Sequence, residues 1–265
     1  MKRKMIYIVL VILAVLIGWQ AWEFWVAVGR QPRGERLERC KQSPQWKDGE
    51  FVNVHETPTL TGDEGFFGQM YKFLFMDWKT VTALRDRVGQ VVCSLGIGEH
   101  FEYWGYDPKK IHDLDWGESY GPLRCLPTRH FSGRMGQHKT LWASYLIEGP
   151  RRIFVSGDGG YDERFMQIGE RYPDIDLAIM ENGQYDKGWR YIHTLPRELP
   201  QAISDLGAAR VLTYHNSKYS LANHSWTEPL DSIYEHAKGQ PWQLLTPRIG
   251  EPIGLDEQQT FRKWW

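Results

Sequence analysis

From Pro122 onward, short apolar stretches alternate with segments of helical character, and this alternation restricts the fold more than any other feature of the chain. It predicts strands over Leu123–Thr128, Thr140–Ile147, Arg152–Ser156, Asp176–Met180 and Arg210–Tyr214, and helices over Tyr161–Tyr172, Pro196–Leu206 and Trp226–Lys238. Gly207 closes the second helix, as a C-terminal glycine commonly does. Strands that alternate with helices form layered α/β domains. A chain of 265 residues has room for one such domain and an appendage.

Three of the predicted strands end in a side chain of the kind that binds metals. His130, Asp158 and His215 each follow a strand and are themselves followed by small or polar residues. Strand ends that lead into loops are where α/β proteins place their sites, and imidazole and carboxylate are natural zinc ligands. Taken singly, each histidine can be an ordinary loop residue and Asp158 a turn residue or helix cap. Their recurrence in one order favours a shared site.

The N-terminus has the composition of a membrane anchor. Three basic residues, Lys2 to Lys4, precede an apolar stretch that extends over Met5–Val28, and Trp19, Trp22 and Trp25 recur near its far end. About 20 apolar residues span a bilayer, and tryptophans gather at its interfaces. We therefore expect a single-pass anchor, with a cleaved signal peptide as the alternative. Basic residues flank both ends, so orientation leans only slightly toward a domain outside the cytoplasm.

Composition also divides the chain into segments, but it does not indicate a binding partner. Residues 1–29 are the expected anchor, 30–50 a polar linker, 51–79 an arm and 80–255 the domain. The domain is expected to open with a helix over Thr80–Val88 and a strand over Gln90–Leu95. The formal net charge of −1 gives no indication of nucleic acid binding. The three cysteines of the chain form no C-x-x-C pair. Cys93 and Cys125 fall in apolar stretches, where a thiol is usually buried.

Several longer motifs resemble one known family. From about Gly65 to Gly250 the chain is similar to metallo-β-lactamase-fold hydrolases of the N-acyl-phosphatidylethanolamine phospholipase D branch. The stretches that carry the resemblance are Gly96–Phe101, Pro127–Ser132, Phe154–Tyr161, Ala178–Gly183 and His215–Ala222. The resemblance implies an αββα sandwich in which two zinc ions serve the hydrolysis of a phospholipid-like substrate of the N-acyl-phosphatidylethanolamine type.

The resemblance also assigns roles to individual residues. His130 is similar to a ligand of the first metal, Asp158 to the catalytic carboxylate that bridges both metals, and His215 to the terminal ligand of the second. His193 resembles a pocket histidine that helps bind the substrate. Its alternative is a surface loop histidine.

One departure from the family pattern weakens these expectations. The family's first metal motif, H-x-H-x-D-H, supplies four ligands, and no two histidines of this chain are separated by a single residue: they are His55, His100, His112, His130, His138, His193, His215, His224 and His236. The nearest imitation, His112–Asp115, is expected in a short helix that Asp107 and Pro108 open. The family's missing strands belong between Trp78 and Lys79, so an internal deletion, or an error in the sequence, accounts for the gap.

The missing motif has consequences for both metal sites and for the fold. Each metal keeps two protein ligands, whereas catalytic zinc normally has three. Much of the first β-layer is absent as well, so apolar sheet is left exposed and can pair with another chain to form an oligomer. We therefore expect an inactive relative of lipid phosphodiesterases. The alternatives are a hydrolase completed by ligands from another chain or segment, and a non-catalytic membrane-tethered binding protein.

Overall fold

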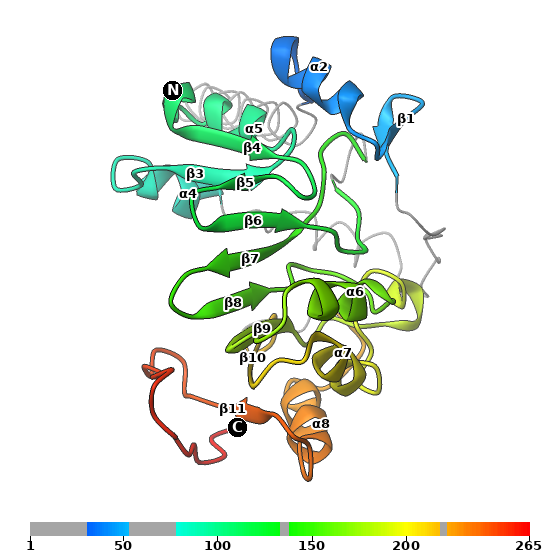
Figure 1. Ribbon diagram of the computed structural model, residues 1–265, viewed down its shortest axis with the longest axis vertical. Coiled ribbons are helices and arrows are strands. Elements are labelled where there is room, and N and C mark those ends of the chain that lie inside the picture. The colour runs from blue at the N-terminus through cyan, green and yellow to red at the C-terminus, as the bar shows by residue number, and fades with distance from the viewer. Residues whose placement is uncertain (1–30, 53–77, 133–137, 218–221) are drawn as a thin grey trace, which may run out of the picture.

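A computed structural model describes residues 31–52, 78–132, 138–217 and 222–265 (Figure 1). A seven-stranded mixed sheet, in the order β11-β10-β9-β8-β7-β6-β5, organises the C-terminal half. Its strands are β5 (Ser119–Tyr120), β6 (Leu123–Leu126), β7 (Ser144–Glu148), β8 (Arg152–Val155), β9 (Leu177–Glu181), β10 (Arg210–Tyr214) and β11 (Gln243–Leu245). The strands β8 to β11 run parallel to one another, and β5 to β8 are antiparallel neighbours.

Three helices cover one face of this sheet, as Figure 1 shows. They are α6 (Arg164–Arg171), α7 (Leu199–Leu206) and α8 (Glu228–His236), with the short 3-10 helix η2 (Lys187–Trp189) before α7. Leu146, Phe154 and Ala178 are register partners on adjacent strands, and they pack against Phe165 and Ile203 of the helices in the main core. The predicted alternation of strands and helices is confirmed here.

The opposite face of the sheet is also apolar but less covered. The register aligns Tyr145, Val155, Ile179 and Leu212 across four neighbouring strands, and all four side chains are half-buried. The expected absence of much of the first β-layer stays a prediction. The expected association of chains through this face of the sheet stays a prediction too.

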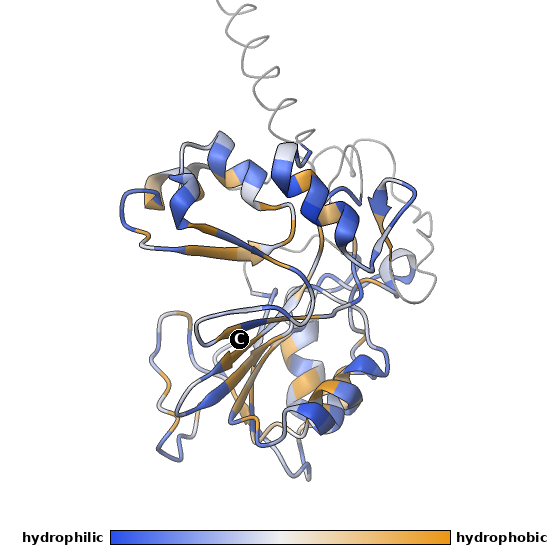
Figure 2. Cartoon of the chain, turned by 45° about the horizontal axis from the view of Figure 1, so that its top comes forward, coloured by the Kyte–Doolittle hydropathy of each residue, from blue (hydrophilic) through white to orange (hydrophobic). Residues whose placement is uncertain are grey.

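A smaller unit lies beside the β5 end of the large sheet (Figure 1). Its elements are α2 (Gly34–Gln42), β1 (Trp46–Lys47), β2 (Glu50–Phe51), α4 (Trp78–Leu84), β3 (Val91–Ser94), α5 (Gly98–Tyr103), the 3-10 helix η1 (Pro108–Lys110) and β4 (Ile111–Leu114). Its strands β3 and β4 pair in parallel. In Figure 2 their apolar residues form a layer of their own, separate from the large sheet.

The helix expected over His112–Asp115 is wrong, because Ile111–Leu114 forms strand β4. Asp113 interrupts the apolar pattern that would indicate a buried strand, yet its side chain points inward. There it accepts hydrogen bonds from the backbone N–H groups of Gly96 and Gly98 at 2.9 and 3.0 Å. A buried carboxylate with partners can stay in a strand interior, and the sequence pattern could not show these partners.

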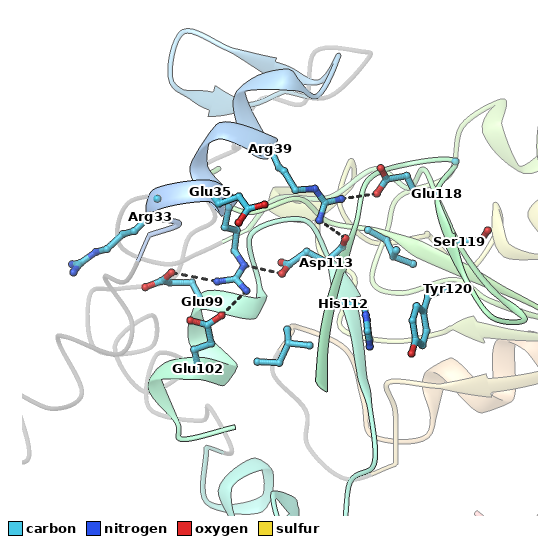
Figure 3. A pocket seen from close by; sticks show the side chains of 15 residues that line it. Arg33, Glu35, Arg39, Glu99, Glu102, His112, Asp113, Glu118, Ser119 and Tyr120 are labelled. Atoms are coloured by element: carbon cyan, nitrogen blue, oxygen red, sulfur yellow. Dashed lines mark hydrogen bonds and ion pairs between the residues drawn. The ribbon is translucent and has the colours of Figure 1, made fainter. Parts of the chain in front are cut away.

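The segment expected as a polar linker contains the packed helix α2. Arg36 of α2 reaches Asp113 and Glu102, and Arg39 reaches Glu118, around a cavity of about 900 Å³ (Figure 3). Cys40, on the same helix, is fully buried with Phe51 and Leu95. Helix α2 is therefore part of the folded unit.

Within the described ranges, we find no helix whose length and apolar character would let it cross a membrane. The longest of these helices, α2 and α8, have nine residues, whereas a span needs about 20. The expected fold with a transmembrane helix, and the expected membrane localisation, are wrong for the structure as described. The stretch on which they rest, Met5–Val28, lies outside the described residues, as does most of the expected arm.

Candidate metal centre

The candidate site lies at one edge of the large sheet, where four strands end. Because β6, β8, β9 and β10 all point the same way in the sheet, their carboxyl ends meet at this edge. His130 follows β6, Asp158 follows β8, Glu181 ends β9 and His215 follows β10. The fold thus brings all four sequence-predicted residues, His193 included, to one place, together with a carboxylate that sequence reasoning missed.

Glu181 is the buried centre of this group. Its side chain is 1% exposed, and Oε1 accepts a 2.5 Å hydrogen bond from the backbone N–H of Thr194. Oε2 lies 2.7 Å from Nδ1 of His193. Glu181 occupies the last position of an apolar strand within a stretch that carries the family resemblance, so a charged residue at a strand end is the signal that could have identified it.

His215 lies between two carboxylates. Its Nε2 is 3.8 Å from Oδ2 of Asp158, and its Nδ1 is 3.5 Å from Oε2 of Glu181. The Nδ1 atom is buried and makes no hydrogen bond of good geometry. The backbone of His215 has a φ of 69°, in the left-handed region that non-glycine residues rarely adopt. Such conformations gather at functional sites, where the surrounding structure holds them.

Gly183 allows this conformation by leaving room for the backbone of His215. A Cβ atom at position 183 would lie 2.5 Å from the carbonyl oxygen of His215. Asn216 supports the same turn by donating from Nδ2 to the carbonyl oxygens of Asn182 and Tyr214, at 3.0 and 3.1 Å. The loops after β9 and β10 are therefore packed against each other.

His130 approaches the group from the opposite side. Its Nδ1 lies 2.7 Å from the carbonyl oxygen of Phe131, and because a carbonyl only accepts, Nδ1 carries the proton and donates. The ring centroids of His130 and His193 are 5.5 Å apart, and those of His193 and His215 are 5.4 Å apart. Each of the three imidazoles thus turns its Nδ1 toward a protein oxygen.

The charges of the site follow from burial and from these neighbours. Burial, together with the nearby His193, lowers the pKa of His130, so this imidazole is neutral at pH 7. Burial alone would raise the pKa of Glu181, but its two histidine neighbours and the N–H of Thr194 bring it below the ordinary value. Burial would lower the pKa of His215, yet the carboxylates of Glu181 and Asp158 raise it. Ionised carboxylate and neutral imidazole are the forms that bind metals.

The donor set fits a divalent metal ion. Glu181, His193 and His215 each offer a ligand atom, and these atoms lie within 4.8 Å of one another. Asp158, whose side chain is 42% exposed, extends the group toward solvent. The unsatisfied Nδ1 of His215 also shows that the polar groups are not all paired by the protein. Imidazole and carboxylate ligands suit zinc and other transition metals.

Comparison with known proteins identifies the class of protein that this fold and site define. Residues 76–216, more than half of the chain, match the family described as Beta-lactamase superfamily domain. The chain therefore belongs to the beta-lactamase superfamily, and its fold, its hydrolase-like character and its suitability for a metal agree with that membership.

The chain is also similar to three individual proteins. An uncharacterized protein of Mycobacterium tuberculosis is 33% identical over 200 residues, covering 72% of this chain and 54% of that protein. Outer membrane protein RomA of Klebsiella pneumoniae is 53% identical over 95 residues, covering 35% of this chain and 72% of that protein. N-acyl-phosphatidylethanolamine-hydrolyzing phospholipase D 1 of Caenorhabditis elegans is 29% identical over 141 residues, covering 47% of this chain and 39% of that protein. The chain spans about half the length of the mycobacterial relative.

Proposed function

We propose that the chain is a zinc-dependent hydrolase that cleaves a phosphodiester bond in lipids of the N-acyl-phosphatidylethanolamine type. This proposal replaces the inactive relative expected from the missing motif, because His130, Asp158 and His215 together can supply the three protein ligands that one catalytic zinc needs. The observation that carries the proposal is the approach of His215 Nε2 to Asp158 Oδ2, 3.8 Å apart at the carboxyl edge of the sheet, with His130 and His193 beside them. The activity for which the nematode relative is named supports the substrate class.

The side chains divide into two roles in this proposal. His130, Asp158 and His215 hold the metal, and His193 contacts the substrate. When bound, a divalent metal stabilises negative charge on the phosphoryl oxygens. The side chain of Asp158 is more exposed than those of His193 and His215, so in this proposal it faces the solvent and the reacting group. His130 can use Nε2 toward the metal, because its Nδ1 donates to Phe131.

The proposal is tested by the hydrolysis of a short-chain N-acyl-phosphatidylethanolamine. The chelated protein is assayed with and without added zinc, beside the variants Asp158→Ala and Glu235→Ala. We expect hydrolysis only with zinc, and a loss of more than about 100-fold in Asp158→Ala, because a removed ligand costs more than an outer partner does. Glu235 lies on α8, and its variant should retain full activity. Hydrolysis that persists in Asp158→Ala would contradict the assignment.

A second candidate is zinc-dependent binding of the same lipid without hydrolysis. The observation that favours it is in the sequence, where no H-x-H-x-D-H motif occurs. Calorimetric titration with the short-chain lipid distinguishes the two functions. Zinc-dependent heat of binding without product supports the second candidate, and product release supports the first.

A further inference from the structure

We propose that Glu181 is a positioning residue that orients His193 and His215 together, by accepting from Nδ1 of His193 and facing Nδ1 of His215, so that both Nε2 atoms are left for the metal and the substrate. This inference deepens the proposed function at the same site and rests on it for any catalytic consequence. The orientation of the imidazoles can be measured without turnover.

The geometry around Glu181 Oε2 carries the proposal. One carboxylate oxygen faces two imidazole nitrogens of the same kind, at 2.7 Å from His193 Nδ1 and 3.5 Å from His215 Nδ1. A carboxylate that faces an imidazole nitrogen selects the tautomer with its proton on that nitrogen. Glu181 therefore selects the Nδ1–H form of both rings.

Burial makes this selection strong. The Glu181 side chain is 1% exposed, and that of His193 is 9% exposed. Water cannot replace either partner at such exposure, and a charge-assisted hydrogen bond in a low-dielectric site is stronger than one in solvent. The backbone N–H of Thr194 holds the other carboxylate oxygen at 2.5 Å, so the carboxylate cannot turn away.

The opposite side of His215 shows where the free nitrogen points. Its Nε2 lies 3.8 Å from Oδ2 of Asp158, on the side of the site where the carboxylate is 42% exposed. The 3.5 Å gap at Nδ1 leaves that buried atom without a hydrogen bond. A small rotation of the ring toward Glu181 would complete the bond while Nε2 still faces Asp158. Histidines that bind metals are held in this manner by a carboxylate behind them.

The alternative role of Glu181 is that of a direct metal ligand, with the metal bound between its carboxylate and the Nδ1 atoms of His193 and His215. In that arrangement a metal would replace the protons on both Nδ1 atoms. In the proposed arrangement the metal meets Nε2 of His215, and the Nδ1 protons stay. The two arrangements therefore differ in one observable, the fate of the Nδ1–H groups when metal is added.

Long-range proton–nitrogen NMR of the full chain, labelled with nitrogen-15 in histidine, measures this observable. Spectra are recorded for the chelated protein and after addition of zinc, and the rings are assigned with His193→Ala and His215→Ala. We expect both rings in the Nδ1–H form before zinc. After zinc, we expect a shift of the His215 Nε2 signal with both Nδ1 protons retained. Loss of the Nδ1 protons on zinc addition, or an Nε2–H form of His193 in the chelated protein, overturns the proposal.

A variant pair adds a second test. Glu181→Gln should move at least half of the His193 population away from the Nδ1–H form, and should weaken zinc binding by about 10- to 100-fold, as losses of such partners do. Glu148→Gln changes a carboxylate at the end of β7 that pairs with Arg124, and it should leave tautomers and affinity unchanged. Unchanged tautomers in Glu181→Gln contradict the inference. If Glu181→Gln does not fold, the spectra of the unaltered chain decide alone.

If the tautomers are as expected but no lipid is hydrolysed, the proposed function fails and the inference stands. If hydrolysis occurs but the tautomers are unchanged in Glu181→Gln, the inference fails and the proposed function stands.

Discussion

Arg36 and Asp113 form an ion pair that joins helix α2 to strand β4 across 77 positions of the chain. Arg36 Nε donates to Asp113 Oδ2 at 2.7 Å, and the Asp113 side chain is only 4% exposed. The other oxygen of Asp113 accepts from the backbone N–H groups of Gly96 and Gly98. Figure 3 shows Asp113 of β4 beside Glu99 and Glu102 of α5, the three carboxylates with which Arg36 forms ion pairs. The N-terminal helix is thereby tied to the smaller unit.

The first prediction concerns this pair. Arg36→Met should lower the free energy of unfolding by about 3 kcal/mol, because it leaves the buried carboxylate of Asp113 without its cation. Urea unfolding followed by far-UV circular dichroism measures the change. Lys41→Met removes an exposed pair with Glu38 on the same helix and should change the value by less than about 0.5 kcal/mol. Equal losses in the two variants would show that Asp113 does not depend on Arg36.

The second prediction concerns the contact of Gly183 with His215. Gly183→Ala places a methyl group 2.5 Å from the carbonyl oxygen of His215, so the two loops must separate. We expect a loss of about 1 to 3 kcal/mol, typical of overpacking, together with weaker zinc binding. Gly89→Ala is the control, because a Cβ there meets nothing within 4 Å; it should change stability by less than about 1 kcal/mol. Tight zinc binding in Gly183→Ala would contradict the role of this contact.

The third prediction concerns the cysteines. Cys40, Cys93 and Cys125 are all buried and free. Burial raises the pKa of Cys40 to about 12, and it raises the pKa values of Cys93 and Cys125 further. Since the thiolate is the reactive form, a disulfide reagent at pH 8 should find no reactive thiol in the native chain and three in urea. A thiol that reacts at once without urea would show that one of these positions is open to solvent.

The fourth prediction concerns the response of stability to alkaline pH. Burial and the hydrogen bond to Asp205, at 2.7 Å, raise the pKa of Tyr161 to about 12. The folded state therefore favours the neutral phenol. This contribution is complete below the unfolded pKa of about 10 and is lost as the pH rises from there toward 12.

Urea unfolding at pH 9 and pH 11 measures this loss. The free energy of unfolding should fall more steeply between the two pH values in the unaltered chain than in Tyr161→Phe, which has no phenol to ionise. Tyr234→Phe, at an exposed position on α8, serves as the control and should follow the unaltered chain. An equal decline in Tyr161→Phe would contradict the role of the hydrogen bond with Asp205.

The sequence predicted strands β6 to β10 and helices α6 to α8 well, because their signals are local, whereas the short edge strands β5 and β11 were not predicted. Strand β10 has the expected bounds, Arg210–Tyr214, and α7 ends at Gly207, whose φ of 64° requires the left-handed conformation that glycine adopts most easily. The element over Ile111–Leu114 was predicted as a helix because an inward-facing Asp113 hides the period of a strand. Its partners come from Arg36, Gly96 and Gly98, and no local pattern reveals them.

The same division holds at the candidate site. The sequence by itself determined that His130, Asp158 and His215 follow strands, since each strand is predicted from its own apolar residues. Only the tertiary structure decided that Glu181 belongs with them. Its partners are His193, 12 positions later on a loop, and His215 after the next strand. A carboxylate at a strand end becomes the centre of a site only when burial and two imidazoles surround it, and those contacts exist only after the sheet has assembled.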